Sequence, residues 1–303
     1  MLAIVIPYYK LTFFTETLES LSNQTDKRFK VYIGDDASPE SPMDLLAHYQ
    51  GKFNFFYHKF ESNLGGNSLA QQWERCIALT ADEEWIMILG DDDYLGENVV
   101  EQFHKHLSEF QSKANVVRFA SRTIVQEENY KATICRHPAW ESATEAYLRK
   151  FKFLTRSSLS EYVFSKKSYE KYGFYNYPLA WNSDDRAWLD FSEDKPIYSI
   201  NEAVVCSRLS AINITGKKDN AVLKNASLVQ FYKFLIENKF KHYTKFDRVK
   251  IIRQYHYVLQ CTKKLDSKDR LFLITNYVQN TSVAVVIGFI KKYVNGTTKS
   301  KRV

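Results

Sequence analysis

The sequence predicts an α/β protein in which helices flank a mainly parallel sheet. Four short apolar runs, rich in β-branched and aromatic residues, occupy positions 3–9, 29–34, 53–58 and 85–89. Runs of this length and composition are typical of buried strands. Segments with helical spacing separate them, and alternating strands and helices favour a parallel sheet, because parallel strands need long crossover connections.

The connecting segments carry apolar residues at helical intervals. These residues are Phe14, Leu18 and Leu21 before the second run, and Leu69, Trp73 and Ile77 before the fourth. A residue three or four positions further along a helix lies on the same face, so each set can cover the sheet. Further strands are expected at 115–120, 122–126, 196–200 and 203–208.

Composition limits the class of protein. With 303 residues, 45% hydrophobic and 25% charged, the chain can bury one large core or two modest ones. Its four cysteines are widely spaced, which argues against a zinc cluster or a disulfide framework and for reduced thiols in a cytosol. The first residues resemble a strand rather than a secretory signal, and no apolar stretch is long enough to span a bilayer.

Charge is distributed unevenly along the chain. From Lys217 onward there are 19 lysines and arginines against 5 acidic residues, a balance of +14, whereas the preceding part has 23 against 30, a balance of −7. A basic, mainly helical C-terminal region (217–303) is therefore expected after a domain at 1–216. This region either contacts anionic lipid or nucleic acid, or is a solvated basic surface without a partner.

Three consecutive carboxylates, the acidic triplet Asp91–Asp93, follow the apolar run at 85–89. Neighbouring like charges raise each other's pKa unless a cation neutralises them. Oxygen ligands suit Mg²⁺ or Mn²⁺, which complete their coordination with substrate phosphates and water. The alternative is a solvated turn that caps a helix at Tyr94-Leu95, but the position after a buried strand favours a metal site.

Two further polar features follow other predicted strands. Asp35 and Asp36 end the run at 29–34, where a carboxylate can accept hydrogen bonds from a nucleobase or a ribose; helix capping is the alternative. The turn Asn63–Gly66 could leave room for a nucleotide through Asn63 and Gly65, although a glycine pair is usually only a turn.

A second group of carboxylates, the acidic pair Asp184–Asp185, precedes Ala187-Trp188-Leu189. There a carboxylate can deprotonate an acceptor hydroxyl that lies within hydrogen-bond reach. On the residues alone, helix capping and first-turn acids are the preferred interpretation.

Taken in order, IVIPYYK, VYIGDDAS, the Asn-x-Gly turn, WIMILGDDDYL and an acidic pair about ninety residues later resemble the family 2 glycosyltransferases of GT-A fold. The resemblance covers about the first 215 residues. It implies a Rossmann-like mixed sheet, with a nucleotide-sugar half at 1–110 and an acceptor half at 111–216. It also implies an inverting transfer of sugar from a nucleotide diphosphate to a hydroxyl, with Mg²⁺ or Mn²⁺ as cofactor.

Carried over position by position, the resemblance places Pro7 and Tyr8 beside the base and Asp35 or Asp36 on the uracil or equivalent ring. Within the acidic triplet, it places Asp92 near the ribose and donor sugar and Asp93 on the metal, with Asp91 as a less certain third member. The acidic pair corresponds to the family's Glu-Asp motif, with Asp184 in place of Glu, and Asp185 becomes the general base.

Several positions depart from the family pattern. Gly90 stands where the family often has Asp, and Ala70-Gln71-Gln72 replaces an Ala-Arg-Asn segment, so an arginine contact to the nucleotide is absent or comes from elsewhere. Arg208-Leu209-Ser210 lacks a metal-binding histidine, although Arg208 or Lys217 could assist the leaving diphosphate. Because the Gln-x-x-Arg-Trp signature of processive synthases is missing, we expect one sugar per encounter.

The acceptor and the membrane are the remaining expectations. Aromatic faces suit sugar rings, and Trp181, just before the acidic pair, is the chosen acceptor-binding residue; ordinary core packing is the alternative. The apolar run 283–290, followed by Lys291-Lys292, could lie in a membrane interface, or it is a core helix with a basic end.

The function expected is transfer of one sugar, most simply from a UDP-sugar, to a glycan or lipid-linked acceptor, as in surface polysaccharide synthesis. The protein would be cytoplasmic, with peripheral contact at the inner face of the plasma membrane as an option. A nucleotidyltransferase is the main rival, but Pro7-Tyr8-Tyr9-Lys10 stands where such enzymes have a glycine-rich loop. A non-catalytic nucleotide-sugar-binding module is the second, and no motif supports nucleic-acid binding.

Overall fold

The computed structural model describes residues 1–217, 219–281 and 287. The chain divides into two compact units, Met1–Lys218 and Asp219–Val303. The apolar run at 283–290 and the lysines after it lie outside the described residues, apart from Ile287.

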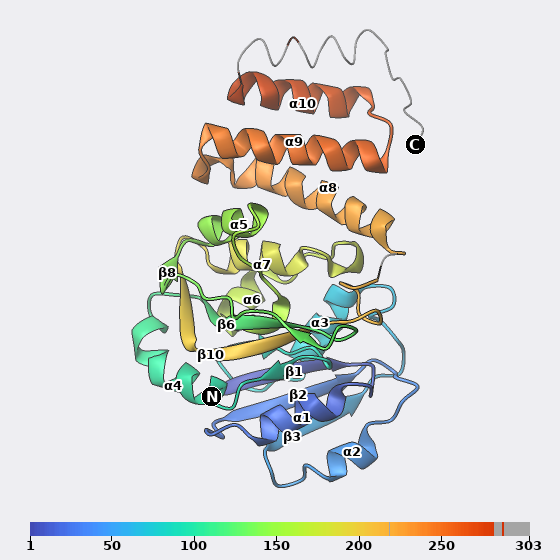
Figure 1. Cartoon of the computed structure of the whole chain (residues 1–303), viewed down its shortest axis with the longest axis vertical. Helices are drawn as coiled ribbons and strands as arrows, with labels where there is room; N and C mark the ends of the chain where they lie inside the picture. Colours follow the sequence, from blue (N-terminus) through green and yellow to red (C-terminus); the bar gives the residue numbers. More distant parts are fainter. Residues whose placement is uncertain (218, 282–286, 288–303) are drawn as a thin grey trace. The chain divides into compact units, whose positions relative to one another are not determined.

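Within the described residues, ten strands of the first unit form one mixed sheet in the order β3-β2-β1-β4-β9-β6-β10-β5, with β7 beside β6 and β8 beside β10 (Figure 1). The strands are β1 (Leu2–Tyr8), β2 (Phe29–Asp35), β3 (Asn54–Lys59), β4 (Trp85–Ile88), β5 (Tyr94–Leu95), β6 (Val116–Val125), β7 (Tyr130–Lys131), β8 (Trp140–Glu141), β9 (Tyr162–Ser165) and β10 (Ile197–Leu209).

Helices connect and cover these strands. Those of the first unit are α1 (Phe14–Ser22), α2 (Met43–Ala47), α3 (Leu69–Ile77), α4 (Val99–Phe110), α5 (Ala143–Phe151), α6 (Lys166–Tyr172) and α7 (Ser183–Phe191), with short 3-10 helices η1 (Leu159–Glu161) and η2 (Pro178–Ala180). In the second unit, α8 (Ala221–Asn238), η3 (Phe240–His242), α9 (Lys245–Thr262) and α10 (Ser267–Asn280) follow one another.

The four N-terminal apolar runs are confirmed as strands β1 to β4, and all four are parallel to their neighbours within this group. Alternate residues of β1 point to opposite faces, so Leu2, Ile4 and Ile6 join a core that α1, α2 and α4 close. On the other face, aromatic rings of α3, β9, α6 and α7 pack together with Phe174, which follows α6; Trp73 of α3 meets Phe174 at 5.4 Å between ring centroids.

Two expected strand boundaries are wrong. The runs at 115–120 and 122–126 form one strand, β6, because buried Ser121 continues the ladder opposite Val205. The runs at 196–200 and 203–208 also form one strand, β10, in which a shift of register between Ile200 and Val204 absorbs the polar residues.

Tyr94-Leu95 is not a helix start but strand β5, which pairs antiparallel with β10.

The helical second unit has the expected amphipathic pattern. Phe231 and Leu235 of α8 and Ile252 and Leu259 of α9 are all buried, at intervals that place each pair on one side of its helix. No helix in the described ranges combines the length and the apolar character needed to cross a membrane.

Candidate active site

The carboxyl ends of β1, β2 and β4 bring together residues that are distant in the sequence. Tyr8 lies opposite Asp35 in the parallel register, and the backbone N–H of Asp36 donates to the carbonyl of Tyr8 at 3.0 Å. The chain of β4 continues beside β1, since Leu89 donates to Val5 at 2.9 Å. Ligands collect at this edge of an open parallel sheet, and the acidic triplet follows directly.

Asp91 is held by the turn that follows β1. Its Oδ2 accepts hydrogen bonds from the backbone N–H groups of Tyr9 and Lys10, both at 2.8 Å. The hydroxyl of Thr17, at the start of α1, contacts the carbonyls of Asp91 and Asp93 at 3.1 and 2.8 Å. The start of the chain therefore fixes the backbone of the acidic triplet.

Asp93 is buried between two elements that lie later in the chain. Its Oδ1 accepts from the backbone N–H of Arg208 at 2.8 Å, and its Oδ2 accepts from the hydroxyl of Ser160 at 2.5 Å. Ser160 in turn accepts from the N–H of Gly90 at 3.1 Å. Each oxygen of Asp93 keeps a lone pair for another ligand, because a carboxylate has about four acceptor positions.

Arg208 lies beside the acidic triplet, but its guanidinium is already engaged. It donates to the carbonyl of Asp92 at 3.0 Å, contacts the side chains of Gln126 and Glu16, and lies 4.2 Å from the centroid of the Phe13 ring. The segment after β10 adds Asn213, whose side chain approaches Asp92 at 3.4 Å. In this arrangement, Arg208 fixes the triplet rather than pointing a free cation at a diphosphate.

Burial leaves the acidic triplet with unbalanced negative charge. Burial first, and then the charge of Asp92, raises the pKa of Asp91 and of Asp93 to about 7. Burial also raises the pKa of Asp92. A cation would relieve this repulsion, and hard oxygen donors suit Mg²⁺ or Mn²⁺.

The donor set fits a cation that is only partly held by protein. Among the described residues, no group of three or more His, Cys, Asp or Glu side chains is arranged to hold a metal ion by itself. Mg²⁺ commonly takes one or two carboxylates and completes its shell with substrate phosphates and water. Asp93 and Asp91 fit that role.

Asp35 and Asp36 lie where the sequence predicts, with carboxylates that contact the protein. Asp35 is fully buried and accepts from Ser38 N–H at 2.7 Å and from the Tyr57 hydroxyl at 2.6 Å. Asp36 accepts from the N–H groups of Leu64 and Gly65 at 2.7 and 2.8 Å.

Arg75 of α3 pairs with Asp36 and lies 3.9 Å from the centroid of the Phe60 ring. It places an arginine beside Asp36, although the Ala70-Gln71-Gln72 segment has none. Arg75 was not predicted; its only signal was a position three residues after Gln72, on the same side of the helix. Gln72 accepts a hydrogen bond from Arg75 in the structure.

The acidic pair stands at the start of α7, as expected, and its two members have different surroundings. Asp185 is buried and accepts from Lys150 Nζ at 2.6 and 2.7 Å and from Asn182 Nδ2 at 2.6 Å. Asp184 is half-buried; burial first, and then the charge of Asp185, raises its pKa to about 7. Lys150 gave no signal in the sequence.

The backbone before α7 is unusual. Leu179, Ala180 and Asn182 have φ of 59°, 51° and 66°, in the left-handed region that non-glycine residues rarely occupy. Such residues cluster at functional sites, where surrounding structure holds them in place. Trp181, the expected acceptor-binding residue, is half-buried within this stretch.

One segment, 156–162, lies between the two acidic groups. Ser160 contacts Asp93, and the Tyr162 ring stacks on Trp188 of α7 at 4.3 Å between centroids. The segment also borders a small pocket beside the acidic pair. The pocket is lined by Arg118, Ala143, Ala146, Tyr147, Lys150, Arg156, Ser157, Tyr162, Asp185, Trp188 and Ile197.

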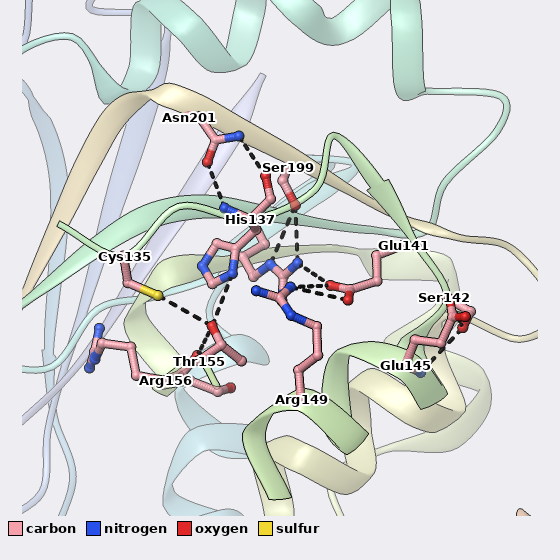
Figure 2. Close-up of polar contacts among 12 residues, drawn as sticks. Cys135, His137, Glu141, Ser142, Glu145, Arg149, Thr155, Arg156, Ser199 and Asn201 are labelled. Atoms are coloured by element: carbon pink, nitrogen blue, oxygen red, sulfur yellow. Dashed lines mark hydrogen bonds and ion pairs between the residues drawn. The ribbon is translucent and has the colours of Figure 1, made fainter. Parts of the chain in front are cut away.

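A buried polar network supports the side of the pocket formed by α5 (Figure 2). Arg118 of β6 donates to Glu141 at 2.8 Å, and Arg149 of α5 donates to the same carboxylate at 3.0 Å. The backbone N–H of His137 donates to Asn201 Oδ1 at 3.0 Å, and Asn201 Nδ2 donates to the carbonyl of His137 at 2.8 Å. Burial first, and then the arginine charges, lowers the pKa of His137 to about 3, so His137 is neutral.

Comparisons with known proteins agree with this arrangement. No sequence among curated proteins matches the chain. S. aureus TarS (residues 1–349, with UDP-GlcNAc) is 12% identical with a TM-score of 0.63, covering 95% of this chain and 83% of that one. The mannosyltransferase PcManGT from Pyrobaculum calidifontis, with GDP-Man and Mn²⁺, is 12% identical with a TM-score of 0.59, covering 97% and 79%.

At these identities the solved structures show the fold alone, and that fold is the predicted α/β, GT-A architecture. The family comes from the sequence: the model described as "Glycosyl transferase family 2" matches residues 3–172, more than half of the chain. The chain therefore belongs to glycosyl transferase family 2, as its strand-end motifs indicate.

Proposed function

We propose that this glycosyltransferase is an inverting, metal-dependent enzyme that moves one sugar from a nucleotide-diphosphate sugar to a hydroxyl of a glycan or lipid-linked acceptor. The observation that carries the proposal is the placement of two carboxylate groups on either side of segment 156–162. The acidic triplet suits a diphosphate with its cation, and the acidic pair suits a proton transfer.

The donor would lie along the carboxyl ends of β1, β2 and β4. Pro7, Tyr8, Asp35 and Asp36 border the base, and the Asn63–Gly66 turn, fixed by Asp36, borders the nucleotide. A UDP-sugar is the first donor to test. UDP-GlcNAc with TarS and GDP-Man with PcManGT support this class of donor, because both proteins share the fold.

The chemistry is one displacement at the anomeric carbon. A carboxylate of the acidic pair takes the proton of the acceptor hydroxyl, the oxygen bonds to the anomeric carbon, and the bond to the diphosphate breaks with its electron pair leaving on the diphosphate. When bound at Asp93 and Asp91, a divalent cation would neutralise charge on that diphosphate. Inversion follows because attack and departure occur on opposite faces.

The acceptor side rests on Trp181 and on the pocket beside the acidic pair. An aromatic face at Trp181 can pack on the C–H groups of a sugar ring. A role in surface polysaccharide synthesis, a cytoplasmic location and peripheral membrane contact through the basic C-terminal region all belong to the same proposal. The uneven charge of the chain supports the membrane contact, since basic residues attract anionic lipid.

The proposal is tested with UDP-glucose, UDP-GlcNAc and GDP-mannose, each with Mn²⁺, Mg²⁺ or EDTA, scored for release of the nucleoside diphosphate and for thermal shift. Asp93→Asn should lose the metal-dependent thermal shift, and the double variant D184N/D185N should keep the shift and lose turnover. If Asp93→Asn binds donor and metal as tightly as the parent, the assignment of the acidic triplet is wrong.

The same panel tests the rivals. A nucleotidyltransferase would release pyrophosphate from UTP and a sugar 1-phosphate rather than nucleoside diphosphate from a nucleotide-sugar. A non-catalytic module would show the thermal shift without turnover in the parent. Either outcome would replace the transfer proposal while leaving the family assignment intact.

A further inference from the structure

The two members of the acidic pair differ in what they can do with a proton. Asp185 is 4% exposed at its side chain and is held by Lys150 through both carboxylate oxygens, at 2.6 and 2.7 Å. Asn182 donates a third hydrogen bond to it at 2.6 Å. Hydrogen bonds from a cation stabilise the ionised carboxylate.

The donors of Lys150 and Asn182 therefore occupy both carboxylate oxygens of Asp185. An acceptor hydroxyl could reach either oxygen only by displacing the Lys150 ammonium. Although burial opposes ionisation of Lys150, the charges of Asp185 and Asp184 raise its pKa above the ordinary value. Breaking one partner of a buried pair is strongly unfavourable, because the other charge remains uncompensated.

Asp184 has the opposite properties. Its residue is half-buried and so can be reached from solvent, and no side-chain donor from the described part of the chain holds its carboxylate. Burial and the adjacent Asp185 bring its pKa to about 7, which is close to the value at which a general base is most effective.

We propose that Lys150 is a positioning residue that occupies both carboxylate oxygens of Asp185 and so leaves the acceptor proton to Asp184. The inference rests on the proposed transfer and deepens it: it reverses the role that the resemblance gives to Asp185. In the step itself, the acceptor O–H bond breaks, the proton bonds to an oxygen of Asp184, and the freed electron pair forms the bond to the anomeric carbon.

Lys150 is the cation of the pocket lining that pairs with the acidic pair, whereas the two arginines of the lining pair with other carboxylates. In the pocket, Arg118 of β6 pairs with Glu141 at 2.8 Å, and Arg156 pairs with Glu161 at 2.8 Å. The remaining cation of the pocket lining is Lys150, and its partner is Asp185.

On α7 itself, Arg186 pairs with Asp190 at 3.2 Å. Several tyrosines also lie near this helix. Tyr147 of α5 and Tyr162 of β9 line the pocket, and Tyr169 of α6 contacts Phe191 at the far end of α7. Burial raises the pKa of Tyr162 and of Tyr169, so both remain neutral near pH 7. They do not compete with Asp184 for a proton in that range.

The kinetic test is the pH profile of nucleotide-sugar turnover, with the donor from the panel above that the parent uses best. Asp184→Asn should lower kcat about 100-fold or more at every pH, the usual contribution of a general base. Lys150→Met should move the acidic limb of kcat to higher pH, since a cation that lowers the pKa of Asp184 is gone. Lys150→Arg should restore the parent profile.

Lys171→Met is the matched control. Lys171 of α6 forms an ion pair with Glu193 at 2.6 Å, but its side chain is 61% exposed and lies outside the pocket. The same substitution there should leave the profile unchanged. Circular dichroism and thermal unfolding of every variant separate a change of profile from a failure to fold.

A second readout does not need turnover. In protein labelled with ¹³C at aspartate carboxyls, the carbons of Asp91 and Asp93 also titrate near pH 7, and they are identified by their loss in Asp91→Asn and Asp93→Asn. One further carbon that titrates near pH 7 should vanish in Asp184→Asn and persist in Asp185→Asn at lower pH, because the neighbouring charge is removed. In Lys150→Met it should move to higher pH. If Asp185→Asn, rather than Asp184→Asn, removes that carbon, the inference is overturned.

The two proposals fail in different ways. If the parent turns over no donor while the carboxyl titration behaves as stated, the transfer proposal fails and the division of roles between Asp184 and Asp185 stands. If the parent turns over its donor and Asp184→Asn does so equally well, the inference is overturned and the transfer proposal stands. The same conclusion follows if Lys150→Met changes neither the pH profile of kcat nor the carboxyl titration.

Discussion

The backbone N–H of Arg208 donates to Asp93 Oδ1 at 2.8 Å, joining residues that are 115 positions apart. This contact ties the end of β10 to the acidic triplet. It also means that Asp93 is placed by the backbone rather than by the identity of the side chain at 208. How far the surroundings of Asp93 stabilise the protein can be measured by substituting the residues around it.

Replacing Ser160 should destabilise the protein. Ser160→Ala removes the hydroxyl that donates to Asp93 and accepts from Gly90, so two buried groups lose a partner. We expect a loss of about 1–3 kcal/mol in the free energy of unfolding, measured with urea. The control is Ser22→Ala, because the Ser22 hydroxyl contacts the carbonyl of Glu19 at the exposed end of α1. This variant should change the free energy of unfolding little, and equal losses in both variants would contradict the role given to Ser160.

Stability without divalent cations should depend on pH in a defined direction. The folded-state pKa values of Asp91 and Asp93, about 7, lie above the ordinary 3.8, so the folded protein binds more protons between those values. Stability should then fall as pH rises from about 4 to 7. Thermal unfolding in EDTA checks this, and Asp93→Asn should flatten the slope; a slope of the opposite sign would refute the charge argument.

Gly65 is expected to tolerate no side chain. A Cβ there would lie 2.6 Å from Asp36 Oδ2. The Asp36 carboxylate cannot easily move, because Gly65 N–H holds Oδ2 while Leu64 N–H and Arg75 hold Oδ1. Gly65→Ala should cost about 1–3 kcal/mol of stability and weaken donor binding in the thermal-shift assay.

Gly66→Ala is the control for this prediction. Its Cβ would meet Asn63 Oδ1 at 2.7 Å, and one hydrogen bond, from the N–H of Gly66, holds that oxygen in place. The comparison is made on stability: if Gly66→Ala lowers the free energy of unfolding as much as Gly65→Ala does, crowding against Asp36 is not the cause.

The buried pair of Arg118 and Glu141 should be essential for stability. Arg118 is 1% exposed, and Arg118→Met would leave Glu141 with Arg149 as its remaining cation. We expect a loss of about 3–5 kcal/mol, as for other broken buried pairs. Arg28→Met, at an exposed pair with Asp26, should leave the free energy of unfolding almost unchanged; chemical denaturation of both variants makes the comparison.

The sequence predicted the parts of the fold that local pattern controls. The strands β1 to β4 and the helices α1 and α3 follow from runs of apolar residues and their spacing. Strand β9 was not predicted: Tyr162–Ser165 is a strand because it lies antiparallel between β4 and β6, and that pairing depends on residues distant in the chain. The unbroken course of β6 and β10 depends on the same long-range ladder.

The residues of the candidate site also fall into those that the local sequence predicts and those that it does not. The acidic triplet and the acidic pair could be found from residue type and position after a strand or before a helix. Their partners could not, since Lys150, Ser160 and Arg75 lie on helices and loops whose neighbours only the folded chain defines. The resemblance gave Asp185 the role of base because a motif carries no information on which carboxylate has a cation beside it.

The insertion of β9 between β4 and β6 has a consequence for biosynthesis. While the ribosome is still making the first 150 residues, the sheet lacks the strand that joins its two halves, and Asp93 lacks both Ser160 and Arg208. Asp93 would lack its two later partners in the nascent chain until Ser160 and the end of β10 arrive, whereas Asp91 is held by earlier residues. Completion of the candidate site is thus a late, long-range event, and a chain released before β10 would have its first motifs without the contacts that hold Asp93.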